Sequence, residues 1–219
     1  MSVDLLIFDW DGTLMDSQAK IVSAMGAAFN SLGFVAPDEL DIRNIIGLSL
    51  DEAILRLDST LPREDRLRLA EAYRQGFNET TITASLFPNT IAALDRCLAQ
   101  GFELAIATGK SHAGLQSALE ETELLNYFKS VRTADRCESK PSPVMIEELL
   151  WENDVVPDRA LMIGDTSFDL QMARNAGVRA IAACYGAHSR AELAEHEPLF
   201  FIERIDELPD KLGKIAHKF

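Results

Sequence analysis

Short apolar runs alternate with helical patterns through the last two thirds of this sequence, and this alternation constrains the fold more than any other feature. The predicted strands are Phe102–Ala107, Ser130–Thr133, Ala160–Ile163, Ala180–Cys184 and Phe200–Ile202. The predicted helices are Thr90–Ala99, Ser111–Glu121, Pro143–Glu152 and Ser167–Asn175. Repeated strand–helix alternation is typical of a parallel sheet with helices on both faces. We therefore predict an α/β fold with a doubly wound parallel sheet, a Rossmann-like core.

A long helical stretch separates the first strand of this sheet from the others. Val3–Phe8 is a nearly continuous apolar run, which suits a strand buried on both faces. Between about residues 17 and 83, apolar residues instead recur at three- and four-residue spacing, and no convincing strand is present. We predict an α/β core of residues 1–14 and 85–219, interrupted by an all-helical cap domain of residues 15–84.

Composition and charge exclude several classes of protein. Hydrophobic residues make up 47% of the 219 residues and charged residues 26%, which is ordinary for a globular protein. The formal net charge of −14 argues against nucleic acids and anionic membranes as partners. No apolar run approaches the ~18 residues of a membrane span, and we expect no secretory signal. Because the three cysteines lack a disulfide framework, we expect a cytoplasmic protein. We also expect a monomer or homodimer whose partner is a small phosphorylated metabolite.

Polar residues gather where the predicted strands end. Asp9 and Asp11 follow the first strand, Thr108 follows the second, and Asp165 follows the strand at 160–163. Ligands of open α/β sheets bind beyond the carboxyl ends of the strands, so these side chains are expected to converge. Lys140 precedes a helix, where the helix dipole disfavours a cation, and this misfit favours an anion-binding role.

These residue types together suit phosphate chemistry with a divalent cation. An ionised Asp9 could attack phosphorus and form an aspartyl-phosphate. Asp11 could give a proton to the leaving oxygen and later take one from water. Mg²⁺ prefers oxygen ligands, so Asp9, Asp165 and the Asp11 backbone carbonyl would suffice to hold it with the phosphate. Lys140 and the Thr108 hydroxyl would bind the equatorial phosphate oxygens.

The order of these motifs resembles that of the haloacid dehalogenase-like superfamily over nearly the whole chain. The motifs are Asp9-Trp10-Asp11-Gly12-Thr13, Thr108-Gly109-Lys110, Lys140-Pro141 and Gly164-Asp165-Thr166-Ser167-Phe168-Asp169. The helical stretch is similar to the small helical cap of that superfamily, and the most similar branch is that of the phosphoglycolate phosphatase-like hydrolases. The resemblance implies that Asp9 is the nucleophile, that Asp11 is the acid and base, and that Mg²⁺ lies on Asp9, the Asp11 carbonyl and Asp165. Supporting positions are Gly12, Thr13, Gly109, Gly164 and Asp169.

Candidates for substrate selection lie in the predicted cap. In the superfamily, a cap loop at the Gly47-Leu48-Ser49 turn faces the leaving group, and Arg43 nearby is a candidate for a substrate carboxylate. Ser49 also opens a capping-box pattern, so a helix is expected to begin there. The resemblance implies a Mg²⁺-dependent phosphatase acting on a small phosphate monoester, with 2-phosphoglycolate as the best single candidate.

Other functions on the same core stay open. A sugar phosphomutase would usually carry a hydrophobic residue in place of Thr13 and an arginine in place of Leu50, so both positions favour hydrolysis. A pyrophosphatase is a further alternative. A dehalogenase would lack Asp11, and a non-catalytic binding module would be expected to have lost Asp9 or Asp165.

Several reactive side chains also have ordinary interpretations. Cys184 and Arg190 match the spacing of thiol phosphatases, but Ala187 stands where such loops need glycine. The Gly109-Lys110-Ser111 stretch resembles the end of a P-loop that lacks its earlier glycine. We expect the Lys110 and His188 side chains to be solvated.

Overall fold

A six-stranded sheet organises the computed structural model, which describes residues 3–216. Its strands are β1 (Leu5–Phe8), β4 (Glu103–Thr108), β5 (Ser130–Thr133), β6 (Ala160–Gly164), β7 (Arg179–Ala183) and β8 (Phe200–Ile202). The spatial order is β5-β4-β1-β6-β7-β8, and each of these pairings is parallel. The chain therefore winds one way from β1 to β5 and the other way from β6 to β8, which confirms the predicted doubly wound sheet. The crevice for a ligand is expected where the winding reverses, beside β1.

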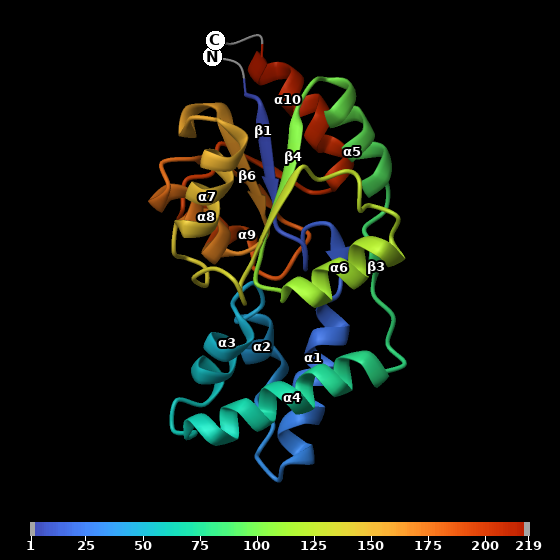
Figure 1. Ribbon diagram of the computed structural model, residues 1–219, viewed down its shortest axis with the longest axis vertical. Coiled ribbons are helices and arrows are strands. Elements are labelled where there is room, and N and C mark those ends of the chain that lie inside the picture. The colour runs from blue at the N-terminus through green and yellow to red at the C-terminus, as the bar shows by residue number, and fades with distance from the viewer. Residues whose placement is uncertain (1–2, 217–219) are drawn as a thin grey trace.

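Helices cover both faces of the sheet (Figure 1). One face packs against α5 (Thr90–Ala99), α6 (His112–Glu121) and α10 (Leu208–Ala216), and the other against α7 (Val144–Asn153), α8 (Ser167–Asn175) and α9 (Arg190–Ala194). Side chains alternate between these layers along a strand, so Leu6 and Phe8 of β1 join the first core while Leu5 and Ile7 join the second. Within residues 3–216, no helix is long and apolar enough to span a membrane.

The remaining four helices form what we call the helical segment. They are α1 (Gln18–Ser31), α2 (Glu39–Arg43), α3 (Leu50–Leu57) and α4 (Arg63–Glu79), and they lie beyond the end of the sheet to which the β1 strand points (Figure 1). Their inward faces build a third core from side chains such as Met25, Phe29 and Leu69. As predicted, Ser49 caps α3, and its side chain accepts a hydrogen bond from the Glu52 backbone N–H.

A short two-stranded ribbon flanks the helical segment where it meets the sheet. β2 (Met15–Asp16) and β3 (Ser85–Leu86) pair antiparallel. The two connections to the segment thus run side by side. The sequence analysis missed this ribbon because two-residue strands are too short for alternation of apolar and polar residues to reveal.

Candidate active site

Asp9 lies directly after the central strand β1, and its side chain is fully buried. Its backbone N–H donates to the Ile163 carbonyl at 3.0 Å, so the residue is held between β1 and β6. The chain then turns at Gly12, where φ is +89° and a Cβ atom would collide with the Asp165 carboxylate. Only glycine meets both conditions without strain. The turn therefore places Asp9 beside Asp165 at the carboxyl end of the sheet.

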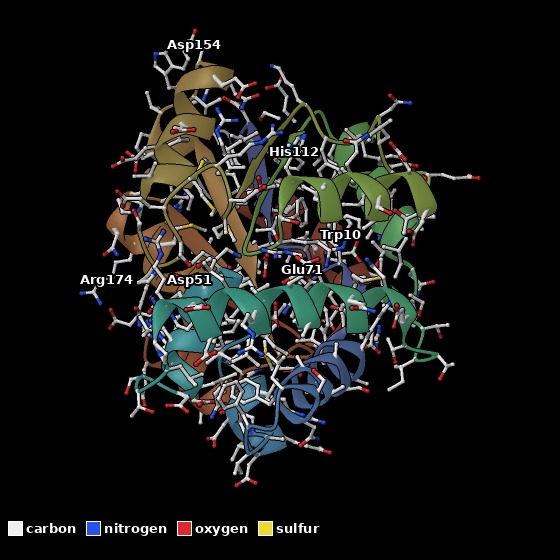
Figure 2. The ribbon with its side chains drawn as sticks, turned by 60° about the horizontal axis from the view of Figure 1, so that its bottom comes forward. Trp10, Asp51, Glu71, His112, Asp154 and Arg174 are labelled. Carbon is white, nitrogen blue, oxygen red and sulfur yellow. The ribbon has the colours of Figure 1, made fainter. Side chains whose placement is uncertain are left out.

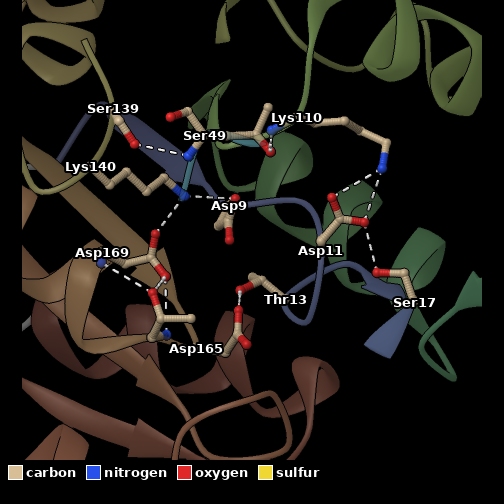
Figure 3. A network of polar contacts seen from close by, with 12 residues as sticks. Asp9, Asp11, Thr13, Ser17, Ser49, Lys110, Ser139, Lys140, Asp165 and Asp169 are labelled. Carbon is tan, nitrogen blue, oxygen red and sulfur yellow. Dashed lines mark hydrogen bonds and ion pairs between the residues drawn. The ribbon is translucent and has the colours of Figure 1, made fainter. Parts of the chain in front are cut away.

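A buried lysine joins Asp9 to a second carboxylate (Figure 3). Lys140 Nζ lies 2.7 Å from Asp9 Oδ1 and 2.6 Å from Asp169 Oδ1, and all three side chains are at most 1% exposed. Burial would lower the pKa of Lys140, but the charges of Asp169 and Asp9 together raise it. Lys140 is therefore a cation at neutral pH, which is the state that binds phosphate oxygens.

Asp169 holds this lysine in place. While its Oδ1 faces Lys140, its Oδ2 accepts hydrogen bonds from the Thr166 backbone N–H at 3.0 Å and from the Thr166 hydroxyl at 2.7 Å. This capping box fixes the start of α8. A Cβ atom at Gly164 would overlap the Asp169 side chain, so this glycine leaves the room that Asp169 occupies.

Asp165 completes the buried group of acids. Its Oδ1 accepts from the Thr13 hydroxyl and its Oδ2 from the Ala187 backbone N–H, both at 2.7 Å. Burial, reinforced by the negative charge of Asp169, raises the pKa of Asp165 to about 7. Burial likewise raises the pKa of Asp9 well above its usual range, against the opposing effect of Lys140. The single positive charge of Lys140 therefore does not balance the negative charges of three ionised carboxylates.

Asp11 faces a different set of partners. Its carboxylate accepts a hydrogen bond from the Ser17 hydroxyl at 2.7 Å and forms an ion pair with Lys110 Nζ at 3.0 Å. Figure 3 shows it turned toward Lys110 and Ser17, on the side away from Asp169. The expectation of a solvated Lys110 is wrong, because its side chain is only 14% exposed and binds Asp11.

The helical segment touches the core beside these acids. A Cβ atom at Gly109 would lie 2.5 Å from the carbonyl oxygens of Gly47 and Leu48, so the turn of the segment rests directly on the backbone after β4. The Ser49 backbone N–H donates to Ser139 Oγ at 2.8 Å, next to Lys140 in the chain. The α4 helix, which carries Glu71, crosses this end of the molecule (Figure 2).

The other predicted side chains are placed as follows. Thr108 is buried at the end of β4, where its hydroxyl oxygen accepts from the Lys110 backbone N–H at 3.2 Å. Arg43 is exposed at the end of α2, and no hydrogen bond or ion pair among the described residues joins it to the acids. The turn at Gly47 and Ser49 reaches the core, whereas Arg43 does not share that contact.

A family model of haloacid dehalogenase-like hydrolases matches residues 6–183. The chain belongs to this family. A protein of Dickeya dadantii named "Probable phosphatase IndB" is 37% identical over 213 residues, which cover 93% of this chain and 91% of that protein. The "Phosphoglycolate phosphatase" of Vibrio vulnificus and the "Pyrophosphatase PpaX" of Bacillus cereus are each 29% identical over 217 residues, 95% of either chain. A solved haloacid dehalogenase-like hydrolase from Streptococcus pneumoniae has a TM-score of 0.82 at 27% identity, covering 95% of this chain and 98% of its own.

These findings confirm the resemblance to the haloacid dehalogenase-like family and the expectation of a hydrolytic enzyme. The relatives of this chain include proteins named as phosphatases. The solved hydrolase from Streptococcus pneumoniae also has the same overall fold as this chain. The acids at the sheet edge are accordingly the candidate active site of this hydrolase.

The residues of this hydrolase suit a divalent metal ion. Ligand oxygens of Asp9, Asp165 and Asp169 lie within 4.8 Å of one another, and within the described chain neither oxygen of Asp9 has a hydrogen bond of regular geometry. Lys140 and Thr166 engage both oxygens of Asp169, Thr13 and Ala187 each donate to one oxygen of Asp165, and Lys140 pairs with Asp9 Oδ1, so among the described residues Asp9 Oδ2 is the oxygen without a partner. Each oxygen of Asp165 accepts one hydrogen bond and keeps a further lone pair for an ion. An all-oxygen donor set is the one that Mg²⁺ prefers.

Sequence analysis missed several residues around the site of this hydrolase. Ser17 and Lys110 bind Asp11, a role that was not predicted for either residue. Lys110 belongs to the Thr108-Gly109-Lys110 motif and Ser17 lies four residues after Thr13, so their place in or near a motif was the available signal. His188 is also not solvated as expected. It is 7% exposed, and its Nδ1 accepts from the Ser167 backbone N–H at 3.1 Å, because the loop after β7 folds back over Asp165.

Proposed function

We propose that this hydrolase is a Mg²⁺-dependent phosphatase of a small phosphate monoester, with 2-phosphoglycolate as the best single candidate. The observation that carries the proposal is the environment of Asp9. Among the described residues, its buried carboxylate has no hydrogen bond of regular geometry, and it lies beside Lys140 and Asp165. A nucleophile, a cation for the phosphate and ligands for a metal ion thus occupy one place. The Vibrio vulnificus relative named as a phosphoglycolate phosphatase supports the choice of ester.

In the proposed first step, a carboxylate oxygen of Asp9 attacks phosphorus. The bond between phosphorus and the ester oxygen breaks, and Asp11 gives that oxygen a proton. To do so, the Asp11 carboxyl has to leave Lys110 and turn toward Asp9. In the second step Asp11 takes a proton from a water molecule, whose oxygen attacks phosphorus and releases Asp9 and inorganic phosphate.

The other residues in the proposal stabilise charge. Lys140 and the Thr108 hydroxyl bind the equatorial oxygens of the phosphoryl group, where charge develops. Asp9, Asp165 and the Asp11 backbone carbonyl would hold Mg²⁺. When bound, the metal offsets the repulsion between Asp9 and the phosphate anion.

We propose residues 15–84 as a cap domain and residues 1–14 with 85–219 as the catalytic core. The contact between Gly47 and Gly109 supports this division, because the helical segment reaches the core through a turn beside the acids. A cap that closes over the site excludes bulk water and selects the leaving group.

Phosphate release from a panel of esters, with Mg²⁺ and with a chelator, tests this proposal. We expect release that requires the metal and that falls at least about 1,000-fold in Asp9→Asn, because this variant lacks the nucleophile. Circular dichroism shows whether the variant keeps its fold. Chelator-resistant release, an active Asp9→Asn variant, or no release from any ester by folded protein would each contradict the proposal.

Pyrophosphate is the second candidate substrate. The Bacillus cereus relative named as a pyrophosphatase favours it, and its leaving group is an anion that the cations described below could bind. Pyrophosphate therefore belongs in the same panel. A higher kcat/KM on pyrophosphate than on 2-phosphoglycolate would make it the preferred substrate.

A further inference from the structure

Two lysines from different parts of the fold flank one aromatic ring near Asp11. Lys20 of α1 places its Nζ 4.5 Å from the centre of the Phe77 ring of α4, and Lys110 of the core places its Nζ 4.9 Å from the same centre. Each distance is within the range of a cation–π contact. The two ammonium groups are therefore less than about 10 Å apart, close enough to act on each other and on one small ligand.

Among the described residues, only one of these two cations has a carboxylate partner. Asp11 binds Lys110, whereas Lys20 has no ion pair with any carboxylate that the structure describes. Tyr73 lies with its ring centre 5.8 Å from that of Phe77, and burial, with the nearby charge of Asp11, raises its pKa, so it stays neutral. Among the described ion pairs at the Phe77 ring, two lysines have one carboxylate partner between them, which leaves an excess of one positive charge there.

The proposed reaction makes this excess larger. Asp11 acts as an acid only when it is protonated and neutral, and only after it has moved away from Lys110. At that moment both lysines lack a carboxylate partner. Lys110 lies 3.0 Å from the present position of Asp11, so its positive charge remains at the place that Asp11 leaves.

We infer that Lys20 and Lys110 form a binding site for a negative charge on the leaving group, so the preferred substrates are phosphate esters or anhydrides whose leaving group is itself a small anion. This inference rests on the proposed phosphatase function. The incoming anion replaces Asp11 on Lys110, which frees Asp11 to turn toward Asp9. A neutral alcohol would leave both ammonium groups uncompensated beside the reacting atoms.

The chemistry of lysine admits two sources of this anion. An ammonium group is a compact point charge without the planar fork of arginine, so it does not distinguish a carboxylate from a phosphate by shape. The carboxylate of a phosphorylated hydroxy acid and the second phosphate of pyrophosphate both fit. Esters of neutral sugars and of aryl alcohols do not.

The test compares three substrates of similar size in the Mg²⁺-loaded enzyme: 2-phosphoglycolate, pyrophosphate and 2-hydroxyethyl phosphate, which is neutral in its leaving group. We expect kcat/KM for at least one anionic substrate to exceed that for 2-hydroxyethyl phosphate by about 10- to 100-fold, the range of a hydrogen bond to a charged group. Lys20→Met is expected to lower this ratio about 10-fold, because kcat/KM falls more for the anionic substrate than for the neutral ester. Which of the two anionic substrates is preferred identifies the source of the anion.

A matched control is Lys129→Met. This substitution removes an exposed lysine that pairs with Glu103 where β4 and β5 begin, at the end of the sheet opposite the acids. This variant is expected to keep the ratio of the wild type. A wild-type enzyme without preference for either anion, or a ratio that changes equally in Lys20→Met and Lys129→Met, would overturn the inference.

Binding to the Asp9→Asn variant separates this inference from the phosphatase proposal. Calorimetry on that variant compares 2-phosphoglycolate and pyrophosphate with 2-hydroxyethyl phosphate without turnover. Tighter binding of an anionic compound that is lost on adding Lys20→Met supports the anion site even if the enzyme hydrolyses none of them. Equal binding of all three compounds overturns the anion site even if the enzyme proves to be a phosphatase.

Discussion

At the scale of single residues, the site depends on one cation among three buried acids. Lys140 contacts Asp9 and Asp169 at ion-pair distance while its own side chain is withdrawn from solvent. A buried ion pair contributes little by its presence, but removing one partner leaves the other charge in a medium that cannot solvate it. The lysine therefore stabilises the fold around the acids, and in the proposed function its charge also binds the phosphate.

We predict that Lys140→Met lowers the free energy of unfolding by about 3 kcal/mol in metal-free buffer at neutral pH. Methionine has a similar length, so lost packing contributes little, and the cost comes from the uncompensated charges of Asp9 and Asp169. Urea unfolding measures the change. Lys129→Met is the control, because its ion pair with Glu103 is exposed and its loss is expected to cost less than about 1 kcal/mol. Equal effects of the two substitutions would contradict the prediction.

The residues that carry chemical motifs could be predicted, whereas their partners could not. Asp9, Asp165 and Lys140 are recognisable because each stands at the end of a predicted strand or the start of a helix. The bond between Lys110 and Asp11 joins residues 99 positions apart, and no local pattern encodes it. The burial of His188 depends on how a loop folds back over Asp165, which is likewise a tertiary feature.

At the scale of elements, the strands and helices that were predicted for the core lie within two residues of the observed ranges, whereas the core helices α9 and α10 were not predicted. This accuracy has a physical cause: a strand buried on both faces needs a continuous apolar run, and its covering helices need one apolar stripe. The β2–β3 ribbon lacks such a signal, since its strands are two residues long. The junction between the helical segment and the core is therefore the part of the fold that is hardest to predict from the sequence.

We predict that Gly109→Ala separates the helical segment from the core at its closest contact. The new Cβ would meet two backbone carbonyl oxygens, at Gly47 and Leu48, which cannot rotate aside as a side chain could. The turn has to move outward, so we expect kcat/KM to fall at least about 10-fold, since misplacement by 1 Å can cost about 100-fold. Because most of each hydrophobic core remains packed, the melting temperature is expected to change by only a few degrees.

The control for this prediction is Gly26→Ala in α1. A Cβ at Gly26 would have no heavy atom within 4 Å, so the substitution tests only helix propensity. It is expected to stabilise the protein by roughly 0.5–1 kcal/mol and to leave kcat/KM unchanged. Steady-state kinetics and thermal unfolding of both variants provide the comparison. Wild-type kcat/KM in Gly109→Ala would show that this contact does not position the catalytic groups.

At the scale of the whole molecule, the buried acids link stability to pH and to metal. The pKa of Asp165 is raised from 3.8 to about 7, and that of Asp9 is raised as well. A carboxyl group with a raised pKa in the folded state stabilises the fold fully below its unfolded pKa, and this contribution is lost as the pH rises through the folded pKa. Without metal, we therefore expect these two groups to destabilise the protein progressively from about pH 4 to about pH 7.

Mg²⁺ is expected to reverse this loss, because it binds the ionised carboxylates and competes with protons. The gain in melting temperature on adding Mg²⁺ is therefore predicted to be larger at about pH 8 than at about pH 5. The pKa of Asp165 sets an upper limit of roughly 4 kcal/mol on the contribution of this residue to the gain, and partial relaxation of the site reduces the contribution to on the order of 2 kcal/mol, or about 5 °C.

Thermal unfolding with Mg²⁺ and with excess chelator at both pH values measures the effect. Asp165→Asn removes both the titrating group and a ligand, so it is expected to abolish most of the difference. A gain that is equal at both pH values, or larger at the lower one, would show that Mg²⁺ does not bind these acids, and the site would then have to stabilise its excess negative charge through Lys140 alone.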